Sequence, residues 1–436
     1  MTGHRTSRGR LLLFAFGDFA FNLSWQSVML FLLFYHTDAL GIPVAVAAAG
    51  FTVASVWDGI VSLLVGLFVD RHAGRIAFGR LLLWTALPLG GSFVLAYAPP
   101  IVPSAVGVAL VIAAHLLFRT AYACANVPYL AMTARISAAP ADRRLVAGAR
   151  MLFGTAASIV VALGTAPIGS ALIGSGSRAY VGAAITFALA GCVILAVVGA
   201  SYREPPGVHV PAGQTLRAAV GSLVANRAYR TLNAAMMAMI VATTVFNKSI
   251  LYYFKYVVGD PSGGELALAA MGAISAVAVP AWMLLARSHS LRRLWLGATA
   301  VVAVGLASFA ALDLVGAGSV QLFLVAMQAM IVGLHFVFWA MLPGTIDYGE
   351  QTTGLRIEAA AFGLAALLQR IAIGVGTLLL GWSFGEAGYV ANAAQDASAL
   401  ATMRSTLALL PLAFFLLSGA LMLLNPLRRD VPLAPA

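Results

Sequence analysis

Long apolar runs separated by short polar connections dominate the sequence, and this alternation decides the class of fold. Read in order, the runs give twelve candidate spans, approximately 11–36, 44–69, 81–98, 104–133, 148–172, 179–200, 231–257, 266–286, 294–312, 319–345, 359–384 and 404–426. A helix crosses the hydrocarbon core of a bilayer in about 20 residues, so these runs are long enough to span it. With 61% hydrophobic and 9% charged residues, the chain also lacks the polar surface of a soluble globule. We therefore predict an all-α integral membrane protein with twelve transmembrane helices.

The basic residues fall in alternate connections, and their distribution predicts the orientation in the membrane. If the N-terminus is cytoplasmic, 20 of the 26 Lys and Arg residues lie on that side, and Arg178, Lys255 and Arg404 lie on the other. Short loops rich in Lys and Arg stay on the cytoplasmic side of a membrane. We therefore expect a multi-pass protein of the cytoplasmic (inner) membrane with both termini cytoplasmic. The net charge of +11 then reflects insertion into the lipid bilayer, and we expect no nucleic-acid partner.

A polar segment with three prolines, residues 201–230, lies in the middle of the chain. It predicts a cytoplasmic linker between an N-terminal six-helix half, 1–200, and a C-terminal six-helix half, 231–436. The later part of the linker, 214–226, is suited to a short amphipathic helix at the membrane surface.

The two halves echo each other in sequence. Tyr129–Met132 precedes a basic loop that ends at Arg150, and Trp339–Leu342 precedes a loop that includes Arg356. Such a repeat is typical of the major facilitator fold, in which two pseudo-symmetric six-helix halves hold a central site between them.

One acidic residue, Asp58, falls near the middle of the run 44–69. An aspartate at the centre of a span costs about 3 kcal/mol to insert, so it normally faces a polar interior and carries a function. Ser62 lies one turn later on the same helix face. We expect Asp58 and Ser62 to take part in binding a coupling ion. The alternative is a neutral carboxylic acid that is hydrogen-bonded between helices.

Two further spans carry polar stripes at helical spacing. In the first span every fourth residue is polar, and in the fourth span the steps are four, three and four, so each stripe lies on one helix face. The stripes consist of Asp18, Asn22 and Gln26, and of His115, Arg119, Tyr122 and Asn126. An arginine keeps its charge, so Arg119 needs an anion nearby, either Asp58 or a carboxylate of the substrate.

The C-terminal half offers fewer polar residues inside its spans. Lys248 lies deep in the seventh span, where it either lines a cavity or makes a structural contact between helices. Gln328 and Trp339 lie in the tenth span and Arg370 in the eleventh. We expect these four residues to contribute to substrate binding, with Trp339 able to stack on a sugar ring.

Several short motifs together resemble one known family, the glycoside-pentoside-hexuronide:cation symporters. They are Gly17-Asp18-Phe19 with Asn22, Tyr35-His36-Thr37-Asp38 with Gly41, Val56-Trp57-Asp58, Asp70-Arg71, Asn126-Val127-Pro128-Tyr129, Asp142-Arg143 with Arg150, the segment 252–260 (YYFKYVVGD), and Asp347-Tyr348-Gly349-Glu350 with Thr353-Gly354-Leu355-Arg356 and Glu358. The resemblance extends over most of the chain.

The resemblance implies roles for individual residues. Asn22 and Arg150 match positions that line the sugar site of the family, and Asn126 matches a position shared between sugar and cation. Asp58 matches a carboxylate of the cation site, and Arg370 matches a lysine of the eleventh helix.

One departure from the family bears on the coupling ion. Sodium-coupled members carry an Asn-Asp pair one turn after the position of Asp58, where this chain has Val61 and Ser62. Sodium requires several oxygen ligands. We therefore expect proton coupling rather than sodium coupling, because a single buried carboxylate can take up and release a proton.

Charge also bears on the solute. Three cations inside the spans, Arg119, Lys248 and Arg370, face only Asp58 and the shallower Asp18, which favours an anionic or strongly hydrogen-bonding solute. The alternative is that these charges form internal ion pairs without a ligand. We expect a secondary active transporter that works by alternating access as a monomer, with a sugar, glycoside, sugar acid or related organic anion as its small-molecule solute.

Four other functions are alternatives to this one. An exporter or a lipid flippase would use the same scaffold. An integral-membrane enzyme is a more distant alternative because the HExxH, GxSxG and phosphate-loop motifs are absent, and for the same reason we expect no catalytic residue, metal or cofactor. A channel would show a selectivity filter or a ring of polar residues, and neither is visible.

Two cytoplasmic segments rich in opposite charges are predicted to act as gates between the halves, or alternatively as static clamps. Their residues are Asp70, Arg71 and Arg75 after the second span, and Asp347, Glu350, Arg356 and Glu358 after the tenth.

Overall fold

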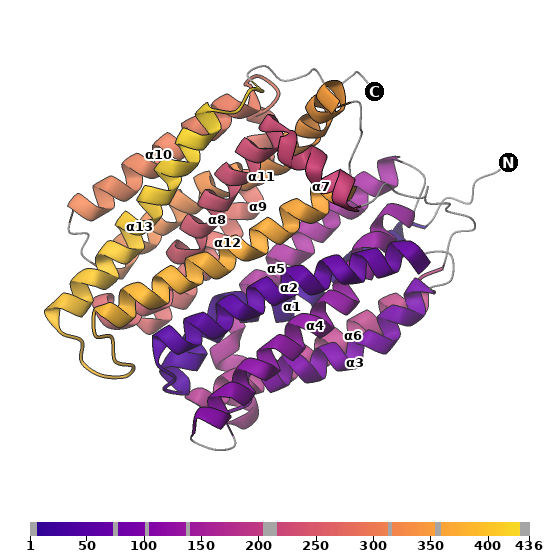
Figure 1. The fold of residues 1–436 in the computed structure, drawn as a ribbon. Coiled ribbons are helices and arrows are strands. Elements are labelled where there is room, and N and C mark those ends of the chain that lie inside the picture. The colour runs from indigo at the N-terminus through magenta and orange to yellow at the C-terminus, as the bar shows by residue number, and fades with distance from the viewer. Residues whose placement is uncertain are drawn as a thin grey trace. The chain divides into compact units, whose positions relative to one another are not determined.

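The computed structural model describes residues 7–72, 77–100, 104–136, 140–203, 216–312, 316–353 and 359–427. Within these ranges every regular element is a helix, and eleven of the helices are long and apolar enough to cross a membrane. The chain divides into two compact units, Met1–Pro211 and Ala212–Ala436 (Figure 1).

The first unit contains six long helices and two π-helical turns. Its elements are α1 (Arg8–Ser27), η1 (Val28–Leu32), η2 (Tyr35–Ala39), α2 (Val44–His72), α3 (Phe78–Ala96), α4 (Ala105–Arg135), α5 (Pro140–Ile173) and α6 (Ser177–Ser201). Helix α1 packs against α5 and α6, α3 packs against α4 and α6, and α2 packs against α4.

The second unit repeats this plan. Its elements are α7 (Leu216–Ala225), α8 (Arg227–Tyr252), η3 (Tyr253–Val258), α9 (Pro261–Leu285), α10 (Leu291–Ala311), α11 (Ala317–Thr353), α12 (Ala359–Glu386) and α13 (Ala397–Leu423). Helix α8 packs against α12 and α13, α10 packs against α11 and α13, and α9 packs against α11. Helices α8 to α13 therefore take the places that α1 to α6 take in the first unit, as the sequence echo predicts.

The repeat extends to the turn that follows the first long helix of each unit. Both helices widen into a π-helical turn before a glycine with positive φ, Gly41 at 68° and Gly259 at 80°. Glycine adopts this backbone conformation without the steric penalty of a Cβ atom. A proline then opens the next helix or stands directly before it, Pro261 in α9 and Pro43 before α2, where a missing N–H is tolerated.

At the start of α9, Asp260 caps the helix. Its carboxylate accepts hydrogen bonds from the Ser262 hydroxyl at 2.7 Å and from the Gly263 N–H at 3.0 Å. These bonds, the Ser262 bond first, lower the pKa of Asp260 because they favour the ionised carboxylate.

Large apolar side chains are exposed along the long helices. Trp84 is 79% exposed, Leu87 75% and Leu322 72%. A soluble protein does not cover its surface this way, but a lipid-facing surface requires it. The exposed residues agree with a helical membrane protein.

The structure corrects three element boundaries. The first helix continues through η1 and η2 to Ala39, beyond the predicted span 11–36. Helix α5 begins at Pro140, so the basic segment before Arg150 is helical rather than a loop. Helix α11 continues to Thr353 and includes Asp347 and Glu350, which were expected in a loop. Polar and charged turns extend these helices beyond their apolar runs. Hydropathy identifies the part of a helix that lies in the membrane and does not identify where the helix ends. The short helix expected within 214–226 is α7.

Candidate functional site

A charged pair joins the first and fifth helices of the first unit. Asp18 Oδ1 on α1 accepts hydrogen bonds from Arg150 Nε at 3.0 Å and from Arg150 Nη2 at 2.8 Å. The side chains are 16% and 18% exposed, so both remain in reach of solvent or solute. Hydrogen bonds between ionised partners are about twice as strong as neutral ones.

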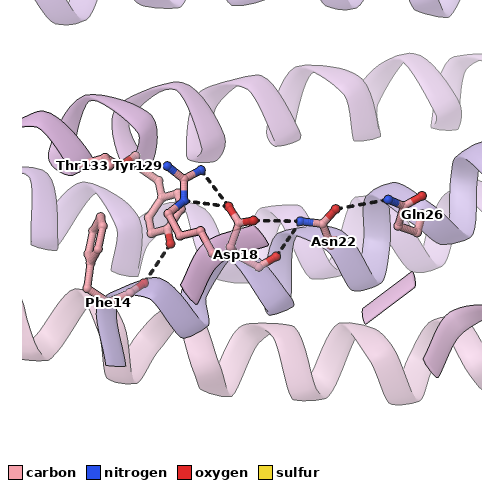
Figure 2. Close-up of polar contacts among 7 residues, drawn as sticks. Phe14, Asp18, Asn22, Gln26, Tyr129 and Thr133 are labelled. Carbon is pink, nitrogen blue, oxygen red and sulfur yellow. Dashed lines mark hydrogen bonds and ion pairs between the residues drawn. The ribbon is translucent and has the colours of Figure 1, made fainter. Parts of the chain in front are cut away.

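The polar stripe of α1 extends this pair into a ladder (Figure 2). Asn22 Nδ2 donates to the Asp18 backbone oxygen at 2.8 Å and to Asp18 Oδ2 at 3.2 Å. Gln26 Nε2 donates to Asn22 Oδ1 at 3.4 Å. The spacing of four residues thus places the three side chains on one helix face. Asn22 and Gln26 are partly exposed, and their amides carry further donors and acceptors.

Helix α4 fixes the other side of Arg150. Thr133 Oγ1 accepts a hydrogen bond from Arg150 Nη1 at 3.0 Å, and the guanidinium carbon lies 5.2 Å from the centre of the Tyr129 ring. The Tyr129 hydroxyl donates to the backbone oxygen of Phe14 at 2.8 Å, which ties α4 to α1 (Figure 2). Gly154, one turn after Arg150, leaves room for the ladder, because a Cβ atom there would lie 3.2 Å from Asn22 Nδ2.

A second charged pair is fully buried between α2 and α4. Arg119 Nη1 lies 3.6 Å from Asp58 Oδ2, and the two side chains are 1% and 0% exposed. The Ser62 hydroxyl donates to Asp58 Oδ1 at 3.5 Å. Of the two anions considered for Arg119 from the sequence, the structure therefore supplies Asp58.

Four more side chains enclose Arg119. Its Nε donates to His115 Nε2 at 3.1 Å, and Nη2 approaches Met29 Sδ at 3.9 Å. Its guanidinium carbon lies 4.7 Å from the Trp25 ring centre and 5.3 Å from that of Phe51. Aromatic faces attract a cation, so the Trp25 and Phe51 rings help to hold this charge away from water.

The remaining predicted residues of α4 lie beside this cluster. The Tyr122 ring lies 4.9 Å from the Trp25 ring and 5.8 Å from the Phe21 ring, so it packs on α1. Asn126 is partly buried one turn further along the helix.

The predicted residues of the second unit are distributed over three helices. On α8 Lys248 is 6% exposed. Gln328 Nε2 on α11 donates to Ser275 Oγ of α9 at 3.0 Å. Trp339, also on α11, is 43% exposed and stacks on Phe362 of α12 with ring centres 6.3 Å apart. On α12, Arg370 is partly buried.

Most of the predicted gating residues fall outside what the structure describes. Arg75, Arg356 and Glu358 lie outside the described ranges, and the side chains of Asp70 and Arg71 are likewise not described. Asp347 and Glu350 lie in the last turns of α11 and are partly buried.

The sequence interpretation missed several partners of the two pairs. Thr133, Phe51 and Met29 carry no sequence signal, because they reach the arginines only through helix packing. The spacing of four residues already places His115 in one stripe with Arg119, and the structure confirms that the two are in contact. Gly154 stands four residues after Arg150, and the same spacing would have placed it on the helix face of that arginine.

Comparisons with known proteins agree with the fold. A family model described as MFS/sugar transport protein matches residues 13–429. The chain is 26% identical over 429 residues to a glucuronide carrier protein homolog of Escherichia coli K12, an alignment that covers 95% of this chain and 91% of that protein. It is 25% identical to the inner membrane symporter YicJ of the same organism, over 93% of this chain and 89% of that protein.

Among solved structures, the nucleoside transporter NupG matches with a TM-score of 0.64 at 16% identity, covering 96% of this chain and 100% of that chain. At this identity the match supports the fold alone.

Proposed function

The chain belongs to the MFS/sugar transport protein family, and from this premise we propose that it carries an anionic sugar derivative across the inner membrane together with a proton. The family membership makes it a membrane transporter. The nature of the solute and of the coupling ion follows from the site.

The ladder on α1 is the observation that supports a sugar-like solute. Asn22 and Gln26 present amides on one face of a membrane helix, beside the paired charges of Asp18 and Arg150. Amides serve hydroxyl groups as both donors and acceptors. The Trp25 ring of the same helix is partly exposed, and an aromatic face suits the apolar face of a sugar ring.

An arginine within reach of the solute supports an anionic group on it. In the first unit each aspartate of the site has an arginine, since Asp18 pairs with Arg150 and Asp58 pairs with Arg119. The Arg150 side chain is 18% exposed, so a carboxylate or sulfonate group of the solute can also reach its guanidinium. The similarity to a glucuronide carrier protein homolog supports the same class of solute.

The surroundings of Asp58 support a proton rather than sodium. A guanidinium occupies one side of the carboxylate at 3.6 Å, and Ser62 supplies one hydroxyl at 3.5 Å on the other. Sodium needs several oxygen ligands. A proton needs a single basic atom.

Uptake into proteoliposomes tests the proposal. With radiolabelled methyl β-D-glucuronide as the probe, we expect accumulation driven by a pH gradient, alkaline inside, and no stimulation by a sodium gradient. The neutral methyl β-D-glucoside should compete less well than unlabelled glucuronide. Asp58→Asn should abolish gradient-driven accumulation and preserve counterflow exchange. Asp396→Asn, a matched change at an exposed position before α13, should leave both unchanged. Sodium-driven uptake, or unaltered coupling in Asp58→Asn, would contradict the proposal.

A further inference from the structure

The contact between Arg119 and His115 fixes which nitrogen of the histidine carries a hydrogen. Arginine Nε always bears a hydrogen and has no acceptor capacity. It donates to His115 Nε2 at 3.1 Å, so Nε2 presents its lone pair. The neutral ring therefore holds its hydrogen on Nδ1, and a second proton has only Nε2 to bind.

Protonation of His115 and its contact with Arg119 therefore exclude each other. A proton on Nε2 would occupy the lone pair that Arg119 uses, and it would place an imidazolium beside a guanidinium. Both side chains are 1% exposed, where like charges repel strongly. Arg119 Nε must then leave the ring.

Asp58 is placed to receive the displaced guanidinium. Its Oδ2 lies 3.6 Å from Arg119 Nη1, whereas a charge-assisted N–H···O bond has a length of about 2.7–2.9 Å. The pair has room to tighten as Arg119 moves away from His115. The carboxylate then faces two cations as their counter-ion.

Charged and aromatic groups of its own helix, of α2 and of η2 lie around His115. Arg119 lies on the same helix, Asp58 reaches it through Arg119 from α2, and the Phe51 ring lies 5.1 Å away. The ring of His36, in η2, lies 6.4 Å from the His115 ring and is a further titratable group that faces it. Helix α3 meets α4 through aromatic rings, with Phe93 5.6 Å from Phe118.

We propose that His115 is the proton-binding residue of the transporter and that its protonation moves Arg119 toward Asp58, leaving the cluster with one net positive charge. This excess charge attracts the acidic group of the solute, so proton and anion are bound together. The mechanism rests on the proposed function for its anion, but the proton step stands on the Arg119–His115 contact alone. Asp58 then acts as a counter-ion, and its replacement disrupts coupling because the two cations lose their partner.

Trp25 offers a readout that needs no solute. Its ring lies 4.7 Å from the guanidinium carbon of Arg119, so a shift of that charge changes its fluorescence. We would titrate the fluorescence of the purified protein with pH and subtract the signal of Trp25→Phe. The difference should show one step between about pH 5 and 8, the range in which histidines titrate.

The variant His115→Gln removes the proton-binding group and keeps the hydrogen bond to Arg119. A glutamine oxygen can still accept the Arg119 hydrogen bond but cannot take up a proton. The Trp25 step should be lost in this variant and retained in His335→Gln, a matched change in the second unit. His115→Asn provides a second variant should the first be unstable. The assignment would be overturned if the wild type showed no step, or if the step survived in the His115 variants. It would also be overturned if the step were lost only in His36→Gln.

The uptake assay distinguishes this assignment from the proposed function. His115→Gln should reduce pH-driven accumulation of methyl β-D-glucuronide at least tenfold and retain counterflow. A wild-type protein with the Trp25 step but without pH-driven uptake would contradict the proposed function and leave the proton site standing. pH-driven uptake that persists in His115→Gln would contradict the proton site alone.

Discussion

Replacing Arg150 with lysine should destabilise the first unit by about 2 kcal/mol. The guanidinium makes two hydrogen bonds to Asp18 Oδ1, at 2.8 and 3.0 Å, and one to Thr133 Oγ1 at 3.0 Å. An ammonium group keeps the charge but acts from a single point, so it can hold Asp18 and must release Thr133 and the planar contact with Tyr129. One lost hydrogen bond to a charged group is worth about 1.5–3 kcal/mol, and the partial exposure of the pair favours the lower half of this range.

A double-mutant cycle with Thr133→Val locates the effect. When Thr133 is already replaced by valine, the bond from Arg150 Nη1 is absent beforehand, so Arg150→Lys should cost about 1 kcal/mol less than in the wild type. The free energies are measured by unfolding in mixed micelles with increasing sodium dodecyl sulfate, followed by circular dichroism. Arg178→Lys, at an exposed position in the first turn of α6, is the matched control. Additive effects, or a loss below about 0.5 kcal/mol for Arg150→Lys, would refute the reasoning.

Three further perturbations follow from the described contacts. Gly154→Ala should weaken glucuronide uptake more than it lowers stability, because the new Cβ atom would lie 3.2 Å from Asn22 Nδ2; Gly148→Ala on the same helix, with no atom within 4 Å, is its control. Tyr129→Phe should cost about 0.5–1.5 kcal/mol in the same unfolding assay, because the Phe14 carbonyl loses the hydrogen bond from α4 and keeps only its partner within α1. Asp260→Ala should lower the melting temperature near neutral pH. Because the folded pKa of Asp260 is lowered, its stabilisation is complete above the unfolded pKa of about 3.9 and is lost as the pH falls through the folded value, so the two melting curves should converge in acid.

The fold could be predicted from the sequence because membrane helices must satisfy their backbone hydrogen bonds internally. Each apolar run therefore predicts a helix, and the sequence similarity between the two halves predicts that their folds repeat. The ends of the helices could not be predicted in this way. Helix α5 starts at Pro140 and α11 continues to Thr353, and both extensions contain charged residues that hydropathy excludes.

The site could be predicted only as far as single helices allow. The spacing of Asp18, Asn22 and Gln26 fixes one face of α1, and the hydrogen bonds follow that face. The partner of Asp18 could not be derived, because Arg150 lies on another helix and their contact depends on how α1 packs against α5. From the sequence, Asp18 was expected to balance the charges of Arg119, Lys248 and Arg370. In the structure, Asp18 forms an ion pair with Arg150.

The two units share a packing plan but carry different chemistry. Aligned on Gly41 and Gly259, the stripe Asp18, Asn22 and Gln26 of α1 corresponds to Met236, Ile240 and Thr244 of α8. In the opposite direction, Lys248 of α8 corresponds to Leu30. Packing constrains such positions by size, whereas a buried charge is retained only where it has a partner or a function. The first unit therefore carries amides and charge pairs on its first long helix and its partners, whereas the corresponding helix of the second unit carries a buried lysine among apolar residues.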